Sequence, residues 1–243
     1  MLVEVVVLVL VFLVFSRLHA AMGKDAAAAT ANALALQSVE RAVHIDIELG
    51  LNRWLAGNPL LCHVAVYAYR LYYVAIVGVL MWVFIRHGEV FRKVRRTLVA
   101  MLLLVLPVYW LVPMSPPRFA LPGSVDIVAM YDIFGRAPSA AGGGENVYSA
   151  MPSMHVGWSL WCAFAVWIAL RAAHPRLALL SWIFPMLMIA IVFATGNHYV
   201  LDVVGGIVLV AASIGVAVLW GRVVERSTAG KPGEGDRVGS PSP

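Results

Sequence analysis

Two short segments of this chain carry histidines beside groups that suit phosphate chemistry. The first is Ser149–His155 (SAMPSMH), where a polar loop meets a long apolar run. Proline fits the first turn of a helix because its missing N–H would be unpaired there, so Pro152 predicts a helix start with Ser153 and His155 in the opening turn. The free N–H groups of such a turn favour anions. The alternative is a simple capping serine and an interfacial histidine.

The second segment is Gly196–Asp202 (GNHYVLD), which contains another histidine and a carboxylate. His198 and Asp202 are four residues apart, so on a helix they would share one face. A carboxylate in that position can hold an imidazole and select its tautomer. This spacing makes a phosphate site more probable than either segment does alone.

Together these residues could transfer a phosphate ester through histidine. His198 is the expected nucleophile, and Asp202 is expected to orient it and stabilise its positive charge. His155 is expected to protonate the leaving oxygen and later to deprotonate the acceptor. Arg118 and Ser153 are expected to bind the phosphoryl oxygens. The chemistry requires no metal and no cofactor, and no HExxH motif or carboxylate cluster suggests one.

The composition indicates what kind of scaffold must position these groups. The 243 residues are 61% hydrophobic and only 13% charged, whereas soluble domains carry about 25% charged residues. We therefore predict an all-α, polytopic membrane protein. The net charge of +5 is concentrated in short segments between apolar runs, which argues against a nucleic-acid partner. Both cysteines lie in apolar stretches without metal-ligand spacing.

The apolar runs predict a bundle of six transmembrane helices, at residues 2–15, 60–85, 97–112, 152–170, 177–195 and 199–220. The first run is short, because a full span needs about 20 residues. A signal-peptide core that ends near His19-Ala20-Ala21 is its alternative, although no basic residue precedes it.

The remaining segments are too polar to cross a membrane. About residues 17–59 are expected to form interfacial helices after the first helix, with Trp54 as an anchor. Residues 113–151 are expected to form a long outer loop, and 227–243 a disordered tail. Residues 1–226 would then form a single membrane-embedded catalytic domain.

The distribution of cations predicts how the helices are oriented. Of eighteen Lys and Arg residues, five lie in 86–96, two in 171–176 and four in the tail, so these segments are expected to be cytoplasmic. With that orientation, Arg118, His155, His198 and Asp202 all reach the extracytoplasmic face. Three separate polar segments agree in this placement, which supports a common site.

The two motifs resemble those of a known family. Pro152–His155 (PSMH) and His198–Asp202 (HYVLD) are similar to the PSxH and HxxxD motifs of the type 2 phosphatidic acid phosphatase superfamily, which has a six-helix membrane bundle. The fuller pattern resembles the branch that includes inositol phosphorylceramide synthase, which moves a phosphoinositol head group between lipids. That fuller pattern comprises Pro116–Arg118, Val125–Asp126, Tyr148–Met151 and Gly205–Gly206.

Two departures from the superfamily's phosphatases bear on the reaction. Those phosphatases usually carry a lysine where this chain has Leu111 and an arginine where it has Val192. The absence of both phosphate-binding cations is typical of the synthase-like branch. It favours transfer to an alcohol over simple hydrolysis.

Arg70 is a further candidate for binding phosphate. It lies about ten residues into its span, hence roughly 15 Å deep by helical rise. An ionisable residue at that depth indicates a function. We predict that it points toward Ser153 and His198 and replaces a missing cation. The alternatives are a structural pairing with Asp202, or snorkelling at the lipid face among Tyr67, Tyr69 and Tyr73.

These inferences predict an integral-membrane lipid phosphotransferase that acts through a phosphohistidine. Its substrate would be a membrane lipid with a phosphate or phosphodiester head group. One alternative is a phosphatase that acts on phosphatidic acid, phosphatidylglycerol phosphate or a polyprenyl phosphate. Another is a non-catalytic scaffold that only binds lipid phosphate.

Overall fold

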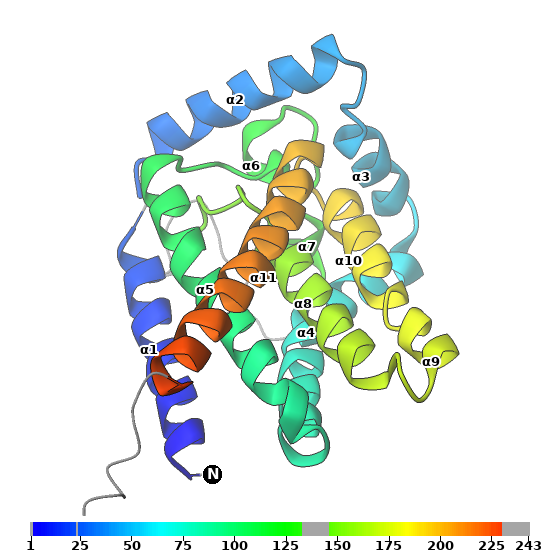
Figure 1. Ribbon diagram of the computed structural model, residues 1–243. Coiled ribbons are helices and arrows are strands. Elements are labelled where there is room, and N and C mark those ends of the chain that lie inside the picture. Colours follow the sequence, from blue (N-terminus) through cyan, green and yellow to red (C-terminus); the bar gives the residue numbers. More distant parts are fainter. Residues whose placement is uncertain (1, 23, 133–145, 230–243) are drawn as a thin grey trace, which may run out of the picture.

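The computed structural model describes residues 2–22, 24–132 and 146–229 (Figure 1). Within these ranges the chain is helical apart from loops and one isolated bridge between Met114 and Ser149. The all-α prediction is therefore confirmed. The helices are α1 (Leu2–Ala21), α2 (Ala26–Ala42), α3 (Glu48–Ala56), α4 (Pro59–Arg86), α5 (Gly88–Leu111), α6 (Pro117–Ala120), α7 (Ile127–Met130), α8 (Met154–Leu170), α9 (Pro175–Leu180), α10 (Ile183–Ala194) and α11 (Val200–Ala229).

Four helical stretches in the described ranges are long and apolar enough to cross a membrane: α4, α5, the α9–α10 stretch and α11. Most residues of their apolar windows are exposed, since only 17% of the α4 window and 44% of the α5 window are buried. Lipid is the solvent that suits such faces. α1 and α2 would make a fifth span only if counted as one crossing bent by 92°. α8 has 17 residues, so the prediction of six spans remains a prediction.

Some helix boundaries differ from the sequence-based expectation. α5 begins at Gly88 and continues through the cationic run, where a loop was expected up to residue 96. The long side chains of that run allow it to be helical while their charges reach water. α11 extends to Ala229, so the first residues of the expected tail are helical. Residues 230–243 and the glycine run at 142–144 lie outside the described residues.

The core of the bundle lies between α5, α8 and α11. α11 packs along α5, and α8 contacts α4, α10 and α11. The large side chain of Trp161 is fully buried here, and its Nε1–H donates to the carbonyl of Val94 at 3.1 Å. Cys62 and Cys162 are both buried free thiols, as their apolar surroundings predicted.

α1 packs on the outside of this bundle, against α5. Its apolar run contains a single acidic residue, Glu4, which forms an ion pair with Arg95 of α5. The pair joins the two helices near the N-terminus of the chain. The structure thereby gives a charged residue in an apolar helix a specific partner.

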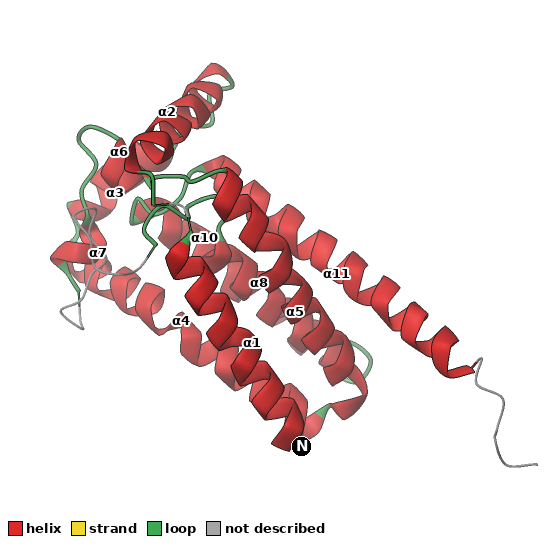
Figure 2. Cartoon of the chain, turned by 90° about the vertical axis from the view of Figure 1, so that its left-hand side faces the viewer, coloured by secondary structure: helices red, strands yellow, loops and turns green. Residues whose placement is uncertain are grey.

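The two ends of the bundle differ in character. The α4–α5 turn, the α8–α9 turn and the C-terminal end of α11 lie at one end, whereas α2 and α6 lie at the other (Figure 1). The side view also places α2 and α6 together with the first turn of α11, away from its C-terminal end (Figure 2). The cationic segments therefore share one end of the bundle, opposite the end that carries the histidine motifs.

Candidate active site

The first histidine motif forms the start of α8. The helix begins at Met154 rather than at Pro152, because Ser153 is its N-cap and accepts a hydrogen bond from the N–H of Val156 at 3.4 Å. The N–H of Ser153 donates to the carbonyl oxygen of Asp202 at 2.9 Å. Ser153 is fully buried and does not line the cavity described below. These contacts are those of a capping serine, and they connect the start of α8 to that of α11.

The second motif lies where α11 begins. His198 precedes the helix by two residues, so its side chain is positioned by loop contacts as well as by helix periodicity. Its Nδ1 lies 2.9 Å from the carbonyl oxygen of Ala150 and 3.4 Å from Oδ2 of Asp202. Both neighbours accept hydrogen bonds in their usual states, so Nδ1 carries the proton. The Nδ1–H group donates a hydrogen bond to the carbonyl oxygen of Ala150. The lone pair is then on Nε2.

Asp202 is completely buried behind His198 in the first turn of α11. Its Oδ2 accepts a hydrogen bond from the N–H of Tyr199 at 2.9 Å. Its other carboxylate oxygen has no hydrogen-bond partner in the part of the chain that the structure describes. The N-terminal turn of the helix stabilises the negative charge of this carboxylate.

His155 lies in the first turn of α8, directly beside His198. Its Nδ1 is 3.5 Å from Nε2 of His198. Two tyrosines of α4 hold the ring, with Tyr69 stacked on it at 4.3 Å and Tyr72 tilted against it at 4.7 Å between centroids. The sequence analysis missed this role of the tyrosines, although their spacing of three residues places both on one helix face.

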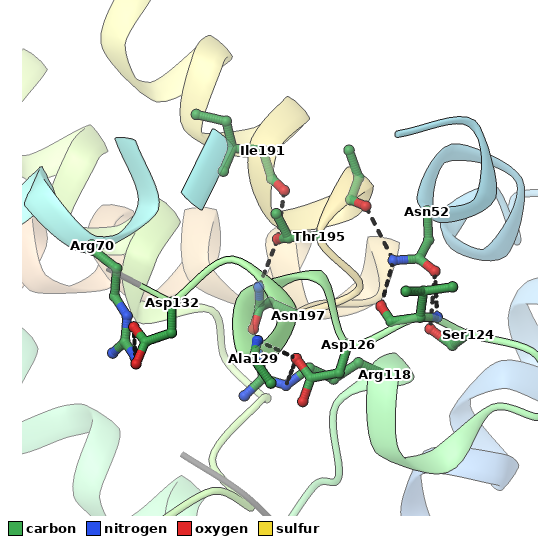
Figure 3. Close-up of polar contacts among 12 residues, drawn as sticks. Asn52, Arg70, Arg118, Ser124, Asp126, Ala129, Asp132, Ile191, Thr195 and Asn197 are labelled. Atoms are coloured by element: carbon green, nitrogen blue, oxygen red, sulfur yellow. Dashed lines mark hydrogen bonds and ion pairs between the residues drawn. The ribbon is translucent and has the colours of Figure 1, made fainter. Parts of the chain in front are cut away.

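Arg118 enters the site from α6, the short helix after the double proline. Its backbone N–H donates to the carbonyl of Gly196 at 2.8 Å, which holds α6 against the loop before His198. The side chain is 6% exposed, and its Nε lies 3.6 Å from Oδ1 of Asp126 (Figure 3). Nε and Nη1 have no hydrogen-bond partner among the described residues. A buried guanidinium with unused donors suits an anion.

Arg70 reaches the same cavity from α4. Its Nη2 forms an ion pair with Oδ1 of Asp132 at 2.8 Å (Figure 3). The side chain is 18% exposed and lines the cavity together with His155 and His198. Arg70 therefore faces the interior rather than lipid, and its partner is Asp132 rather than Asp202.

A buried asparagine holds the loop that carries Asp126. Nδ2 of Asn52, on α3, donates to the carbonyls of Val125 at 3.0 Å and Ala194 at 3.2 Å. Its Oδ1 accepts the N–H of Val125 at 2.7 Å (Figure 3). These bonds join the loop to α3 and to the end of α10. The sequence analysis did not single out Asn52, because nothing in its local pattern indicates that it is buried.

These residues surround a cavity of about 570 Å³. Its lining includes the two histidines, Arg70, Arg118 and the α4 tyrosines. It also includes residues of α1, where Nε2 of His19 lies 3.0 Å from Oγ of Ser149. Further polar and aromatic lining residues are Phe12, Phe15, Ser16, Tyr109 and Asn146.

The positions where superfamily phosphatases carry cations contribute nothing to the cavity. Leu111 is 70% exposed at the end of α5, and Val192 is fully buried in the core. Neither residue lines the cavity, where the arginines are Arg70 and Arg118. The structure thus brings together His155, His198, Asp202, Arg118 and Arg70, while Ser153 lies behind them.

Comparison with known proteins identifies a family. The model of the PAP2 superfamily matches residues 34–216, which is more than half of the chain and includes both histidine motifs. Searches of curated proteins and of solved structures found no match.

Proposed function

Because this chain belongs to the PAP2 superfamily, and so is a phosphatase or phosphotransferase enzyme, we propose that it is a membrane lipid phosphotransferase that works through a phosphohistidine. The observation that carries this proposal is the position of His198. Its Nδ1 is held by Ala150 and Asp202, and its Nε2 faces His155 in the cavity. A nucleophile, an orienting carboxylate and a candidate acid thus occupy one enclosed site.

In the first step, Nε2 of His198 attacks the phosphorus of the lipid. The N–P bond forms as the bond from phosphorus to the leaving oxygen breaks, and His155 donates its proton to that oxygen. The imidazole becomes positively charged while phosphorylated. The Ala150 carbonyl and the Asp202 carboxylate both stabilise that charge at Nδ1.

In the second step, an alcohol or water attacks the phosphohistidine. The acceptor gives its proton to His155, its oxygen bonds to phosphorus, and the N–P bond breaks. His198 regains its lone pair and His155 regains its proton. The cycle is therefore balanced without a further reactant.

The spacing of the two histidines implies a movement when lipid binds. Reacting atoms approach to about 3–3.5 Å before reaction, and a phosphoryl group must fit between nucleophile and acid. The 3.5 Å between Nε2 of His198 and Nδ1 of His155 leaves no room for it. The rings must therefore separate, or His155 must act through its other nitrogen, in the complex with substrate.

Arg118 and Arg70 are proposed to bind the phosphoryl oxygens. Arg118 has unused buried donors that face the cavity, which supports a direct contact. Arg70 is already paired with Asp132, so its contribution would require that this aspartate be exchanged for phosphate. The two arginines would then stand in for the cations that Leu111 and Val192 replace.

Transfer to an alcohol is favoured over hydrolysis by the polar groups that line the cavity. Ser16, His19, Asn146 and Ser149 offer hydroxyl, imidazole and amide groups in the same cavity as the histidine pair. Such groups suit a polyhydroxylated head group such as an inositol phosphate. We therefore propose an activity similar to that of inositol phosphorylceramide synthase, with lipid phosphatase as the alternative.

We also propose an orientation for the enzyme. The cationic segments at one end of the bundle favour the cytoplasm by the positive-inside rule. The C-terminal tail would then be cytoplasmic, and the active site would lie at the extracytoplasmic face of the cell membrane.

The decisive experiment uses purified full-length protein and a panel of head-group-labelled lipids, with products identified by mass spectrometry. Transfer of a phosphoryl-linked head group to an added alcohol would support the phosphotransferase. Release of inorganic phosphate instead would identify a phosphatase. Acid-labile labelling of wild-type protein, absent from His198→Ala, would demonstrate the phosphohistidine. A protein that binds these lipids but gives neither product nor label would be a scaffold.

A further inference from the structure

Two glutamates that this mechanism does not use are buried against the start of α11. Glu40 of α2 and Glu48 of α3 are 0% and 1% exposed, which is rare for glutamate without a partner. Oε1 of Glu40 accepts the N–H of Leu201 at 2.7 Å, and Oε1 of Glu48 accepts the N–H of Val200 at 3.0 Å. Both carboxyl groups thus cap the helix whose first turn carries Asp202.

Asp202 completes a group of three carboxyl groups around one helical turn. It accepts the N–H of Tyr199 at 2.9 Å, so three successive N–H groups each bond a different carboxylate. These N–H groups would otherwise be unpaired, because the first turn of a helix lacks internal partners for them. The helix N-terminus offers only a partial positive charge, equivalent to about half an elementary charge. It cannot balance three full negative charges.

Among the described residues no lysine or arginine pairs with these three carboxyl groups, and the imidazole of His198 lies 3.4 Å from Asp202. The other titratable group that faces Glu40 is the hydroxyl of Tyr199, beside Asp202 and Glu48. Arg118, on the adjacent α6, lies at the cavity next to Asp126. Arg41, the next residue of α2, is 59% exposed and lies near Asp46.

The second oxygens of the two glutamates lack donors. Oε2 of Glu40 and Oε2 of Glu48 are buried without a hydrogen-bond partner in the described part of the chain. A buried polar atom without a partner is costly, and a buried like-charged pair more so. One proton shared between the glutamates would give each oxygen a partner and remove one charge.

We propose that Glu40 and Glu48 form a proton-sharing carboxyl pair that positions the first turn of α11 and with it Asp202 behind His198. The pair connects α2 and α3 to the turn that carries Asp202, and both glutamates are positioning residues that do not touch the substrate. Its effect on turnover rests on the proposed function. The shared proton itself follows from the contacts alone.

The pair makes the site sensitive to alkaline pH. Burial, together with the neighbouring Glu48 carboxyl, raises the pKa of Glu40 from 4.5 to about 8. This stabilising contribution is fully present below about pH 4.5 and is lost as the pH rises through about 8. Above that value the pair has lost its shared proton, and its added negative charge repels Asp202 and loosens the turn that holds it.

Infrared spectroscopy of the purified full-length protein tests the pair without any substrate. We expect the C=O band of a protonated carboxyl near neutral pH, and its loss at about pH 9. Glu40→Gln should lack the band, because Gln can donate to Glu48 and leaves no proton to share. The matched control is Glu89→Gln, at the other end of the bundle, where the side chain is 73% exposed. It should keep the band.

Turnover against pH tests the positioning role. Wild type should lose about tenfold between neutral pH and about pH 9, one unit above the pKa. Glu40→Gln should keep its neutral-pH rate over that range, while Glu40→Ala should be impaired throughout because it leaves the N–H of Leu201 unpaired.

Each outcome has a distinct meaning. A band that is absent near neutral pH, or unchanged in Glu40→Gln, would overturn the pair. The expected band with the same alkaline loss in Glu40→Gln as in wild type would overturn the positioning role. The expected band in a protein that processes no lipid phosphate would leave the pair intact and overturn the proposed function.

Discussion

His198 is held at Nδ1 by two acceptors of different kinds, and this arrangement predicts how Asp202 contributes. The Ala150 carbonyl, at 2.9 Å, can hold the tautomer without the carboxylate, which lies at 3.4 Å. Asp202→Asn should therefore lose less than the about 10⁴-fold seen when a serine-protease triad loses its aspartate. His198→Ala should have no turnover and no phosphoenzyme. Rates for both variants, measured with one labelled lipid, check the prediction.

The result for Asp202→Asn also separates two roles of the carboxylate. A loss of about 10⁴-fold or more would mean that Asp202 selects the tautomer, and that the Ala150 contact does not suffice. Measurable activity in His198→Ala would refute the nucleophile. Melting temperatures of both variants should be measured alongside, because Asp202 also caps α11 through Tyr199.

The two arginines of the cavity should differ in their importance. Both arginines have a carboxylate neighbour, but Nε of Arg118 lies 3.6 Å from Asp126 and makes no hydrogen bond among the described residues, whereas Nη2 of Arg70 donates to Asp132 at 2.8 Å. Removing one donor that stabilises a transition state costs about 10²–10³-fold, so we expect at least this for Arg118→Ala and less for Arg70→Gln. Arg118→Lys keeps the charge but loses the planar fork, so it should remain impaired.

The prediction is checked by measuring initial rates of the three arginine variants at saturating and at limiting lipid concentration and comparing each with the wild type. Equal losses for Arg118→Ala and Arg70→Gln would show that Arg70 contacts phosphate as directly as Arg118. Normal kinetics for Arg118→Lys and Arg118→Ala alike would mean that α6 does not reach the substrate.

At the scale of elements, the contact between α8 and α11 controls the geometry of the site. A Cβ at Gly206 would lie 2.7 Å from the carbonyl oxygen of Ser153, and backbone cannot rotate away as a side chain can. Gly206→Ala should push the helices apart, with a loss of about 1–3 kcal/mol in the free energy of unfolding. Turnover should fall as well, because Ser153 bonds the Asp202 carbonyl across this contact.

Gly215 offers a matched control on the same helix. A Cβ there meets nothing within 4 Å, so Gly215→Ala should be neutral or stabilising by about 0.5–1 kcal/mol. Thermal unfolding and turnover of both variants are the measurements. A Gly206→Ala protein as stable and active as Gly215→Ala would show that α8 and α11 can accommodate a Cβ at position 206 without separating.

At the scale of the whole molecule, the cationic segments and the candidate active site lie at opposite ends of the bundle. This separation predicts how the protein is oriented in the membrane. Ser38 on α2 and Ser227 near the end of α11 are both exposed. α2 and the C-terminal end of α11 lie at opposite ends of the bundle (Figure 1). In intact cells, a membrane-impermeant maleimide should label Ser38→Cys but not Ser227→Cys. In permeabilised cells, the maleimide should label both variants. The native thiols are buried and should not react. The reverse labelling pattern would invert the proposed topology.

The sequence by itself determined the class of the protein and indicated most residues of the candidate site. Apolar runs with polar interruptions predicted an all-α membrane bundle, because the bilayer requires helices that pair their own backbone groups. The spacing of His198 and Asp202 predicted their pairing, since four residues make one helical turn. The proline-rich segment with Arg118 could also be assigned to the site, because both motifs and this loop shared one predicted face.

Other features depended on contacts between distant segments. The Ala150 carbonyl that holds His198, the tyrosines that hold His155, and the Asp132 partner of Arg70 all come from separate parts of the chain. Ser153 was assigned to phosphate, yet its contacts are those of a helix cap. A local sequence pattern shows which groups are close along the chain. It does not show which hydrogen-bond donors each group accepts in the folded protein.

The buried acidic residues show this limit most clearly. In the sequence, Glu40 and Glu48 belong to a polar segment that reads as an exposed interfacial helix. In the structure their carboxyl groups are buried against the first turn of α11. Glu40 and Leu201, which are 161 positions apart, meet there because α11 begins with N–H groups that need acceptors. Only tertiary packing determines which acceptors lie beside them.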